Sequence, residues 1–246
     1  MLESLYQTYL QSRRVTTDSR QITPGCIFFA FKGETFDGNA FAPQALEQGA
    51  ALCVISDPKY KVDDRCIVVP DVLTTLQELA CHHRAQLTIP IVGITGTNGK
   101  TTTKELAHAV LSRHYRTHAT AGNFNNHLGV PLTLLAIPAD AEIAIIEMGA
   151  NHPGEIAALC HIADPDFGLI TNVGRAHLEG FGGFEGVVKP RPSSIAIWLP
   201  NRARPLSMPT TTPSPLRPPY ASYPSLHTVR RRRHRCVGIW SAPTPI

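Results

Sequence analysis

TIPIVGITGTNGKTTTKEL, residues 88–106, decides the fold of the second part of the chain. Its apolar beginning predicts a buried strand over 88–95, and a helix is expected from about 100 to 115. The glycine-rich turn between them presents backbone N–H groups at a helix N-terminus, which favours phosphate oxygens. Five residues separate Gly93 from Gly99, so the strict GxxxxGK[ST] spacing fails, and the alternative is an ordinary strand–helix turn. The strand–loop–helix context favours a phosphate-binding loop.

Two side chains of this loop have the chemistry that a phosphate site needs. Lys100 would reach the β- and γ-phosphates, and the Thr101 hydroxyl would lie on Mg²⁺.

Strands and helices continue to alternate after this loop. Strands are predicted over 142–148 and 166–173, and helices over 132–136 and 154–162. This alternation predicts an α/β domain over 87–189, with a parallel sheet and crossover helices, in which the pattern stops while it is still running.

Two residues at strand ends are candidate metal ligands. Glu147 ends a predicted strand, and a carboxylate at that edge suits a metal, although a merely solvated glutamate is the alternative. His177 lies beyond the next strand end, but spacing alone favours a structural histidine there.

The loop over 122–131 gathers three side-chain amides, those of Asn123, Asn125 and Asn126. Such a loop suits hydrogen bonding to a polar substrate, but asparagine and glycine are also turn formers. The residues alone favour neither a substrate-binding loop nor an ordinary turn.

The first part of the chain, residues 1–86, predicts a small α/β domain. Its strands are expected over 26–31, 51–56 and 66–70, and its helices over 2–12, 41–49 and 72–86, the last capped by Asp71.

Charge and composition separate residues 190–246 from the rest. The formal net charge is +4, yet these residues hold nine arginines and no acidic residue, so the preceding part is mildly acidic. They also hold 12 of the 21 prolines, which predicts a disordered tail. The arginine run 230–233 permits a nucleic-acid patch, but a solvated charge run is favoured, and we expect no nucleic-acid partner.

We expect the chain to be neither a membrane-spanning, nor a secreted, nor a disulfide-bonded protein. No apolar run approaches the roughly 20 residues that span a bilayer, and the N-terminus lacks a secretion signal. The six cysteines form no CxxC pair, which favours reduced cysteines and a cytoplasmic location.

Five stretches together give the chain a family resemblance. They are DSRQITPGCIFFAFKGETFDGNAF (18–41), GTNGKTTTKEL (96–106), GNFNNHLGVPLTLL (122–135), IIEMGANHPGEIAALC (145–160) and ITNVGRAHLEGFGGFEGV (170–187). They resemble the Mur ligases, in which a nucleotide-substrate domain precedes a P-loop ATPase domain. The third stretch favours the member that adds D-alanyl-D-alanine to UDP-N-acetylmuramoyl-tripeptide. The alternative is the member that forms that tripeptide.

The resemblance implies a reaction and a set of site residues. The substrate carboxylate attacks the γ-phosphate of ATP, and the incoming amine displaces phosphate from the acyl phosphate. Lys100 and His177 would be catalytic, and Thr101, Glu147 and His177 would hold metal, with Mg²⁺ expected. The remaining implied contacts are Gly96, Thr97, Asn98, Gly99, Lys100, Thr101 and Thr102 to ATP, Ser19, Arg20, Lys32 and Gly33 to the uridine nucleotide, and Asn123, Asn125 and Asn126 to the muramoyl-peptide. A monomer without membrane contact is expected.

The resemblance stops after about residue 189. By this resemblance the family's carbamylated lysine is matched by Arg191, which cannot form that carbamate, and we expect the rest of the ATPase domain and the dipeptide domain to be missing. A one-base shift turns the ordinary continuation Thr-Lys-Thr-Glu-Leu-Tyr-Arg-Tyr-Leu into the Pro-Arg-Pro-Ser-Ser-Ile-Ala-Ile-Trp of residues 190–198. We therefore expect a frameshifted, inactive ligase chain. The alternatives are a non-catalytic fragment that binds the UDP substrate, or a P-loop protein that binds nucleic acid through the tail.

Overall fold

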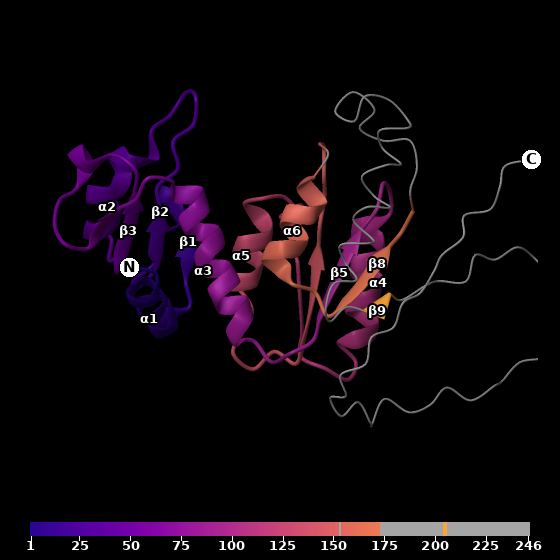
Figure 1. The fold of residues 1–246 in the computed structure, drawn as a ribbon. Helices are drawn as coiled ribbons and strands as arrows, with labels where there is room; N and C mark the ends of the chain where they lie inside the picture. Colours follow the sequence, from indigo (N-terminus) through magenta and orange to yellow (C-terminus); the bar gives the residue numbers. More distant parts are fainter. Residues whose placement is uncertain (153, 173–203, 206–246) are drawn as a thin grey trace, which may run out of the picture. The chain divides into compact units, whose positions relative to one another are not determined.

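The computed structural model describes residues 1–152, 154–172 and 204–205 (Figure 1). These residues form two sheets whose named strands all pair in parallel, which confirms the predicted α/β class. The strand orders are β1-β2-β3-β4 and β6-β7-β5-β8-β9. The predicted residue His177 and the departure at Arg191 lie outside the described residues.

The first sheet is buried on both faces. It contains β1 (Val15–Thr16), β2 (Ile27–Phe29), β3 (Leu52–Ile55) and β4 (Cys66–Val68). Along β2 the side chains alternate, so that Ile27 and Phe29 join one apolar cluster while Phe28 joins another. Helices α1 (Leu2–Ser12) and α3 (Val72–Gln86) contribute to the first cluster, and α2 (Ala42–Glu47) contributes to the second.

Helix α3 begins and ends where the sequence predicts. The carboxylate of Asp71 accepts a hydrogen bond from the amide of Thr74, 2.7 Å away, and so caps the helix N-terminus. The apolar face is buried at Val72, Leu76 and Leu79.

The second sheet carries helices on both faces (Figure 1). Its strands are β5 (Ile91–Thr95), β6 (Thr117–Ala119), β7 (Ile143–Glu147), β8 (Phe167–Ile170) and β9 (Arg204–Pro205). Helix α4 (Lys100–Leu111) lies against one face, and α5 (Gly129–Leu135) and α6 (Glu155–Ala163) lie against the other. The chain leaves β5 toward β6 and later passes β5 to reach β8, so the carboxyl end of β5 is a topological switch point, where α/β sheets bind ligands.

Several predicted boundaries are wrong. Helix α5 begins at Gly129, not at residue 132, because its start tolerates Pro131. Residues 38–41 form a short 3-10 helix before α2, and the other short 3-10 helices, Ser19–Gln21 and Pro58–Tyr60, were not predicted. Strands β1 (Val15–Thr16) and β6 (Thr117–Ala119) were missed because they are short and, unlike the predicted strands, do not lie in an apolar run.

The expectation that residues 190–246 contain no strand is wrong at one place. Arg204 and Pro205 pair in parallel with Phe167 and Gly168 of β8. Proline lacks an N–H group but still accepts hydrogen bonds through its carbonyl, so it is compatible with a strand at a sheet edge.

Helix α3 also contacts the elements of the second sheet. The side chain of Arg84, 7% exposed, donates to the carbonyl oxygens of Ala163 and Asp164 at the end of α6, at distances of 2.6–3.1 Å. It also pairs with the carboxylate of Asp166 at 3.0 Å, and that carboxylate accepts from the amide of Ile91. One guanidinium therefore joins α3, α6 and the start of β5.

The remaining sequence expectations concern membranes and cysteines. Over the described residues, no helix combines the length and apolarity that crossing a membrane requires. Among the described residues, Cys26, Cys53, Cys66 and Cys160 are buried free thiols, and Cys81 is half-buried and free.

Candidate functional site

The loop between β5 and α4 needs glycine at two positions for different reasons. Gly96 has a φ of 139°, and a Cβ there would lie 2.1 Å from the hydroxyl oxygen of Thr171. Gly99 precedes α4 with a φ of 77°, in the left-handed region that other residues rarely adopt. Gly96 is therefore required because Thr171 lies so close, and Gly99 because of its backbone conformation.

The end of β8 holds the middle of this loop. The carbonyl of Asn172 accepts from the amide of Thr97 and its side-chain oxygen accepts from the amide of Asn98, each at 3.0 Å. The hydroxyl of Thr171 and the side-chain Nδ2 of Asn172 donate to the carbonyl of Asn98, at 2.6 and 3.1 Å. Sequence reasoning missed Asn172, because the predicted strand over 166–173 included it, whereas the observed strand β8 (Phe167–Ile170) ends two residues before it.

The first turn of α4 follows directly from the loop. No side chain caps this helix, so the amides that precede the first intrahelical bond point out of its N-terminus. The ammonium of Lys100 folds back and donates to the carbonyl oxygens of Gly96, at 2.9 Å, and of Thr97, at 3.1 Å. N–H groups, a positive helix end and a lysine therefore meet at the switch point of the sheet.

Glu147 is a buried carboxylate beside this helix end. It ends β7, is 1% exposed and pairs in register with Ile94 of the neighbouring β5. Its Oε1 accepts from the hydroxyl of Thr101, at 3.2 Å, and from the side-chain amide of Asn125, at 2.8 Å. Its Oε2 is buried and has no hydrogen-bond partner among the residues that the structure describes.

An orphaned carboxylate oxygen next to a threonine hydroxyl fits a hard divalent cation. Mg²⁺ takes one or two protein oxygens together with phosphate oxygens and water, which is the donor set gathered here. Within the described ranges no group of three or more His, Cys, Asp and Glu side chains is assembled. The structure thus brings together two of the three predicted metal ligands, Thr101 and Glu147, while the third, His177, lies outside the described residues.

The three asparagines of the loop before α5 have different environments. Asn125 turns toward Glu147, as described above, and its carbonyl accepts from the amide of Gly149. The side-chain oxygen of Asn126 accepts from the amides of Leu128 and Gly129 at the start of α5, at 3.1 and 2.8 Å. Asn123 is exposed.

A second polar region lies at the carboxyl edge of the first sheet. Ser19 and Arg20 follow β1, while Lys32 and Gly33 follow the neighbouring parallel strand β2. Arg20 donates to both carboxylate oxygens of Asp18, at 2.9 and 2.8 Å, and these hydrogen bonds lower the pKa of Asp18 to about 2.

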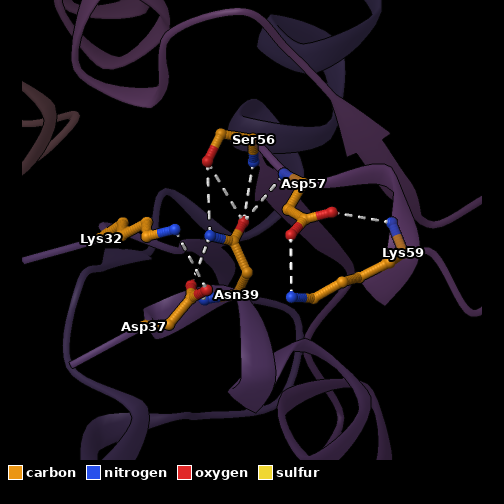
Figure 2. Close-up of polar contacts among 6 residues, drawn as sticks. All are labelled: Lys32, Asp37, Asn39, Ser56, Asp57 and Lys59. Carbon is orange, nitrogen blue, oxygen red and sulfur yellow. Dashed lines mark hydrogen bonds and ion pairs between the residues drawn. The ribbon is translucent and has the colours of Figure 1, made fainter.

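A buried asparagine holds this edge together (Figure 2). Asn39 is fully buried, donates to the carboxylate of Asp37 at 2.6 Å and accepts from the amide of Ser56 at 2.8 Å. The hydrogen bond from Asn39 is the main cause of the lowered pKa of Asp37. The ammonium of Lys32 lies 3.9 Å from the same carboxylate, so the loops after β2 and β3 are tied beneath an exposed lysine. Sequence reasoning missed Asn39, since nothing in its neighbourhood marks it as internal.

Two family models match the chain in succession. The Mur ligase family, catalytic domain, matches residues 12–84, and the Mur ligase middle domain matches residues 94–191. The second match contains the phosphate loop, Asn125 and Glu147, and the first contains Ser19, Arg20, Lys32 and Gly33.

Individual relatives and a solved structure agree with these models. The UDP-N-acetylmuramoyl-tripeptide–D-alanyl-D-alanine ligase of Bacillus subtilis is 45% identical over 72% of this chain and 39% of its own length. The ligase of the same name from Mycobacterium bovis is 34% identical over 95% of this chain and 50% of its own length, a match that extends into residues 190–246. The crystal structure of MurF ligase from Thermotoga maritima in complex with ADP is 37% identical, with a TM-score of 0.72 over 80% of this chain and 46% of that one. The chain therefore spans about two fifths to one half of the length of these relatives.

Proposed function

Because the chain belongs to the Mur ligase family, we propose that it carries the first part of an ATP-dependent ligase that adds D-alanyl-D-alanine to UDP-N-acetylmuramoyl-tripeptide. The observation that carries the proposal is the meeting of an uncapped helix N-terminus, Lys100 and the orphaned carboxylate of Glu147 at one sheet edge. The similarity to ligases that bear this name over most of the described residues supports the substrate assignment.

In the proposed reaction, the carboxylate of the muramoyl-tripeptide takes the γ-phosphoryl group, and the amine of the dipeptide then displaces phosphate. The residues from Gly96 to Thr102 form the proposed ATP-phosphate site, in which the amides from Gly99 onward donate to the phosphates. Lys100 places its positive charge on the phosphoryl group that moves. Mg²⁺, when bound, neutralises charge between the reacting anions.

Thr101 and Glu147 are the proposed magnesium ligands. The hydroxyl and carboxylate oxygens lie 3.2 Å apart, so both side chains could hold one Mg²⁺ ion with little movement. Asn125, which we expected to face the peptide, donates to Glu147 and therefore orients the carboxylate. Asn123, exposed in the same loop, is the asparagine that we propose for the muramoyl-peptide. The role of His177 in holding a second metal stays a proposal from the family resemblance.

The first sheet is the proposed uridine-nucleotide domain, over about residues 1–86. Ser19, Arg20, Lys32 and Gly33 follow two adjacent parallel strands, so they share the carboxyl edge at which α/β sheets bind ligands. The two cations suit the pyrophosphate of a UDP sugar, and each is already paired with an aspartate, Asp18 or Asp37.

Binding of ADP to the purified 246-residue chain tests the nucleotide part of this proposal. Calorimetry is expected to show saturable binding that Mg²⁺ strengthens. Lys100→Met is expected to weaken binding about 10- to 100-fold, as for a lost hydrogen bond between charged groups. Lys61→Met removes an exposed lysine whose ion-pair partner is Asp64, and it serves as the matched control. Equal affinity in the Lys100 and Lys61 variants would refute the phosphate site.

Titration with UDP-N-acetylmuramoyl-tripeptide tests the other part. We expect saturable binding that Lys100→Met leaves unchanged and that Arg20→Met weakens. Because the chain spans only part of its relatives, we expect it to bind without completing ligation. Formation of the pentapeptide product by residues 1–246 alone would overturn that expectation.

A further inference from the structure

Lys104 is a buried cation on the helix that begins at the phosphate loop. Helix α4 holds 12 residues, and Lys104 is the one among them that is buried, with 1% of its side chain exposed. Its position faces the sheet, where an amphipathic helix ordinarily places an apolar residue. Burying an ammonium group costs free energy that an apolar side chain would not. Hydrogen bonds to the ammonium group must therefore offset this cost.

The ammonium of Lys104 fixes the end of β6. Its Nζ donates to the carbonyl oxygen of Thr120 at 2.7 Å, and Thr120 is the residue that follows the strand. The carboxylate of Glu105 lies 2.8 Å from the same nitrogen, but that side chain is 63% exposed. The neutral carbonyl of Thr120 is thus the internal partner of the ammonium.

Thr120 in turn holds Glu147. The amide of Thr120 donates to the carbonyl of Ile145 at 3.0 Å, and the amide of Glu147 donates to the hydroxyl of Thr120 at 2.9 Å. The loop that leaves Thr120 carries Asn125, which donates to Oε1 of Glu147. Both the backbone and the carboxylate of Glu147 are therefore held by a segment that begins at Thr120.

We propose that Lys104 is a positioning residue for the metal-binding carboxylate. It anchors Thr120 to α4, and Thr120 and Asn125 then present Glu147 to Thr101, which lies one turn earlier on the same helix. Helix α4 thus supplies one metal ligand directly and positions the other. The metal role rests on the proposed function, whereas the anchoring of Glu147 through Thr120 does not.

Amide hydrogen exchange of the full chain tests the anchoring without any ligand. Lys104→Met keeps the length of the side chain and removes the ammonium. We expect the amide of Glu147 to exchange about tenfold faster in this variant, as expected for the loss of about one net hydrogen bond. His108→Met is the matched control, because the Nε2 of His108 lies 3.2 Å from the carbonyl of Thr117, at the other end of β6. It is expected to change the exchange of Glu147 less than twofold.

Binding of Mn²⁺ in the presence of ADP, followed by electron paramagnetic resonance, tests the consequence for the metal. Lys104→Met is expected to weaken Mn²⁺ about tenfold while His108→Met leaves it unchanged. Thr120→Val is a second variant, which keeps the carbonyl that Lys104 contacts and removes the hydroxyl that Glu147 contacts. It is expected to reproduce both effects.

The two readouts separate the two claims. Equal exchange of the Glu147 amide in the Lys104, His108 and unsubstituted chains would overturn the positioning role, whatever the metal does. Faster exchange with unchanged Mn²⁺ affinity would overturn its link to the metal. If the unsubstituted chain binds no Mn²⁺ with ADP, the proposed function fails, and exchange alone decides whether Lys104 anchors Glu147.

Discussion

Replacing Arg84 by methionine tests whether one buried guanidinium holds α3 to the second sheet. The substitution removes the donors for the carbonyls of Ala163 and Asp164 and leaves Asp166 without its cation. Asp164 ends α6 with a φ of 36°, in a conformation that directs the last carbonyls of that helix toward Arg84. Met keeps most of the apolar stem, so the variant isolates the charge and its hydrogen bonds.

The expected loss of stability follows from the burial of the pair. Breaking a buried ion pair from one side costs about 3–5 kcal/mol. The carboxylate of Asp166 is 30% exposed and keeps the amide of Ile91, so the lower end applies, about 3 kcal/mol. For a chain of this size that corresponds to a decrease in Tm of roughly 6–12 °C.

Urea unfolding followed by circular dichroism measures this loss. The matched control is Arg116→Met, since Arg116 likewise pairs with carboxylates (Asp140 and Glu142) and donates to a carbonyl, but its side chain is 61% exposed. Its loss is expected to be below about 0.5 kcal/mol. If the two variants unfold at the same urea concentration, the reasoning about Arg84 is refuted.

Four further predictions use other parts of the chain. Lys100→Met is expected to lower the free energy of unfolding by about 1 kcal/mol, because its hydrogen bonds to the carbonyls of Gly96 and Thr97 are only partly buried, and to weaken ADP binding about 10- to 100-fold. Burial lowers the pKa of His83 to about 4, so the unfolded chain binds the proton at a higher pH than the folded chain does. The free energy of unfolding is therefore expected to fall as the pH decreases from about 6.5 to 4. A His83→Phe chain whose free energy of unfolding depends on pH in the same way would contradict this. The pKa of Asp18, about 2 through its bonds with Arg20, is expected to return toward 4 in Arg20→Met, measured by carboxyl NMR; the stabilising contribution of the pair is present above pH 4 and lost between pH 4 and 2. Resequencing codons 185–200 is expected to reveal a missing base and a lysine codon in place of that for residue 191, and an intact reading frame there would refute the frameshift.

Local chemistry explains which parts of the fold could be predicted. Asp71 before an apolar helical pattern fixed the bounds of α3, and two glycines with a lysine after an apolar strand located the phosphate loop. Helix α5 was predicted too short because Gly129 and Pro131 are usually helix breakers. In the structure, a Cβ on Gly129 would lie 2.3 Å from the backbone of Phe124, so close packing requires that glycine, and Asn126 supplies acceptors for the first amides.

The partners of the site residues could not be predicted from spacing. Thr101 and Glu147 are 46 positions apart, and their contact exists only because β5 and β7 are neighbours in the sheet. Asn125 resembles every other turn asparagine in the sequence until the sheet places it beside Glu147. Lys104 is one of two lysines within five residues, and only the direction of its side chain distinguishes it from Lys100, which folds back onto the loop carbonyls.

Because Lys100, unlike Lys104, contacts the loop itself, its present hydrogen bonds decide which groups of the loop can turn to a bound phosphate. The ammonium of Lys100 satisfies two neutral carbonyls, and the amides of Thr97 and Asn98 are satisfied by Asn172. A phosphate oxygen that takes over Lys100 replaces neutral acceptors with a charged one, and charge-assisted hydrogen bonds are roughly twice as strong as neutral ones. The amides held by Asn172 gain no such advantage, because their present bonds are part of the loop's own structure. We therefore expect phosphate to engage Lys100 and the amides from Gly99 onward, while the bonds to Asn172 keep the loop in shape before and after the exchange.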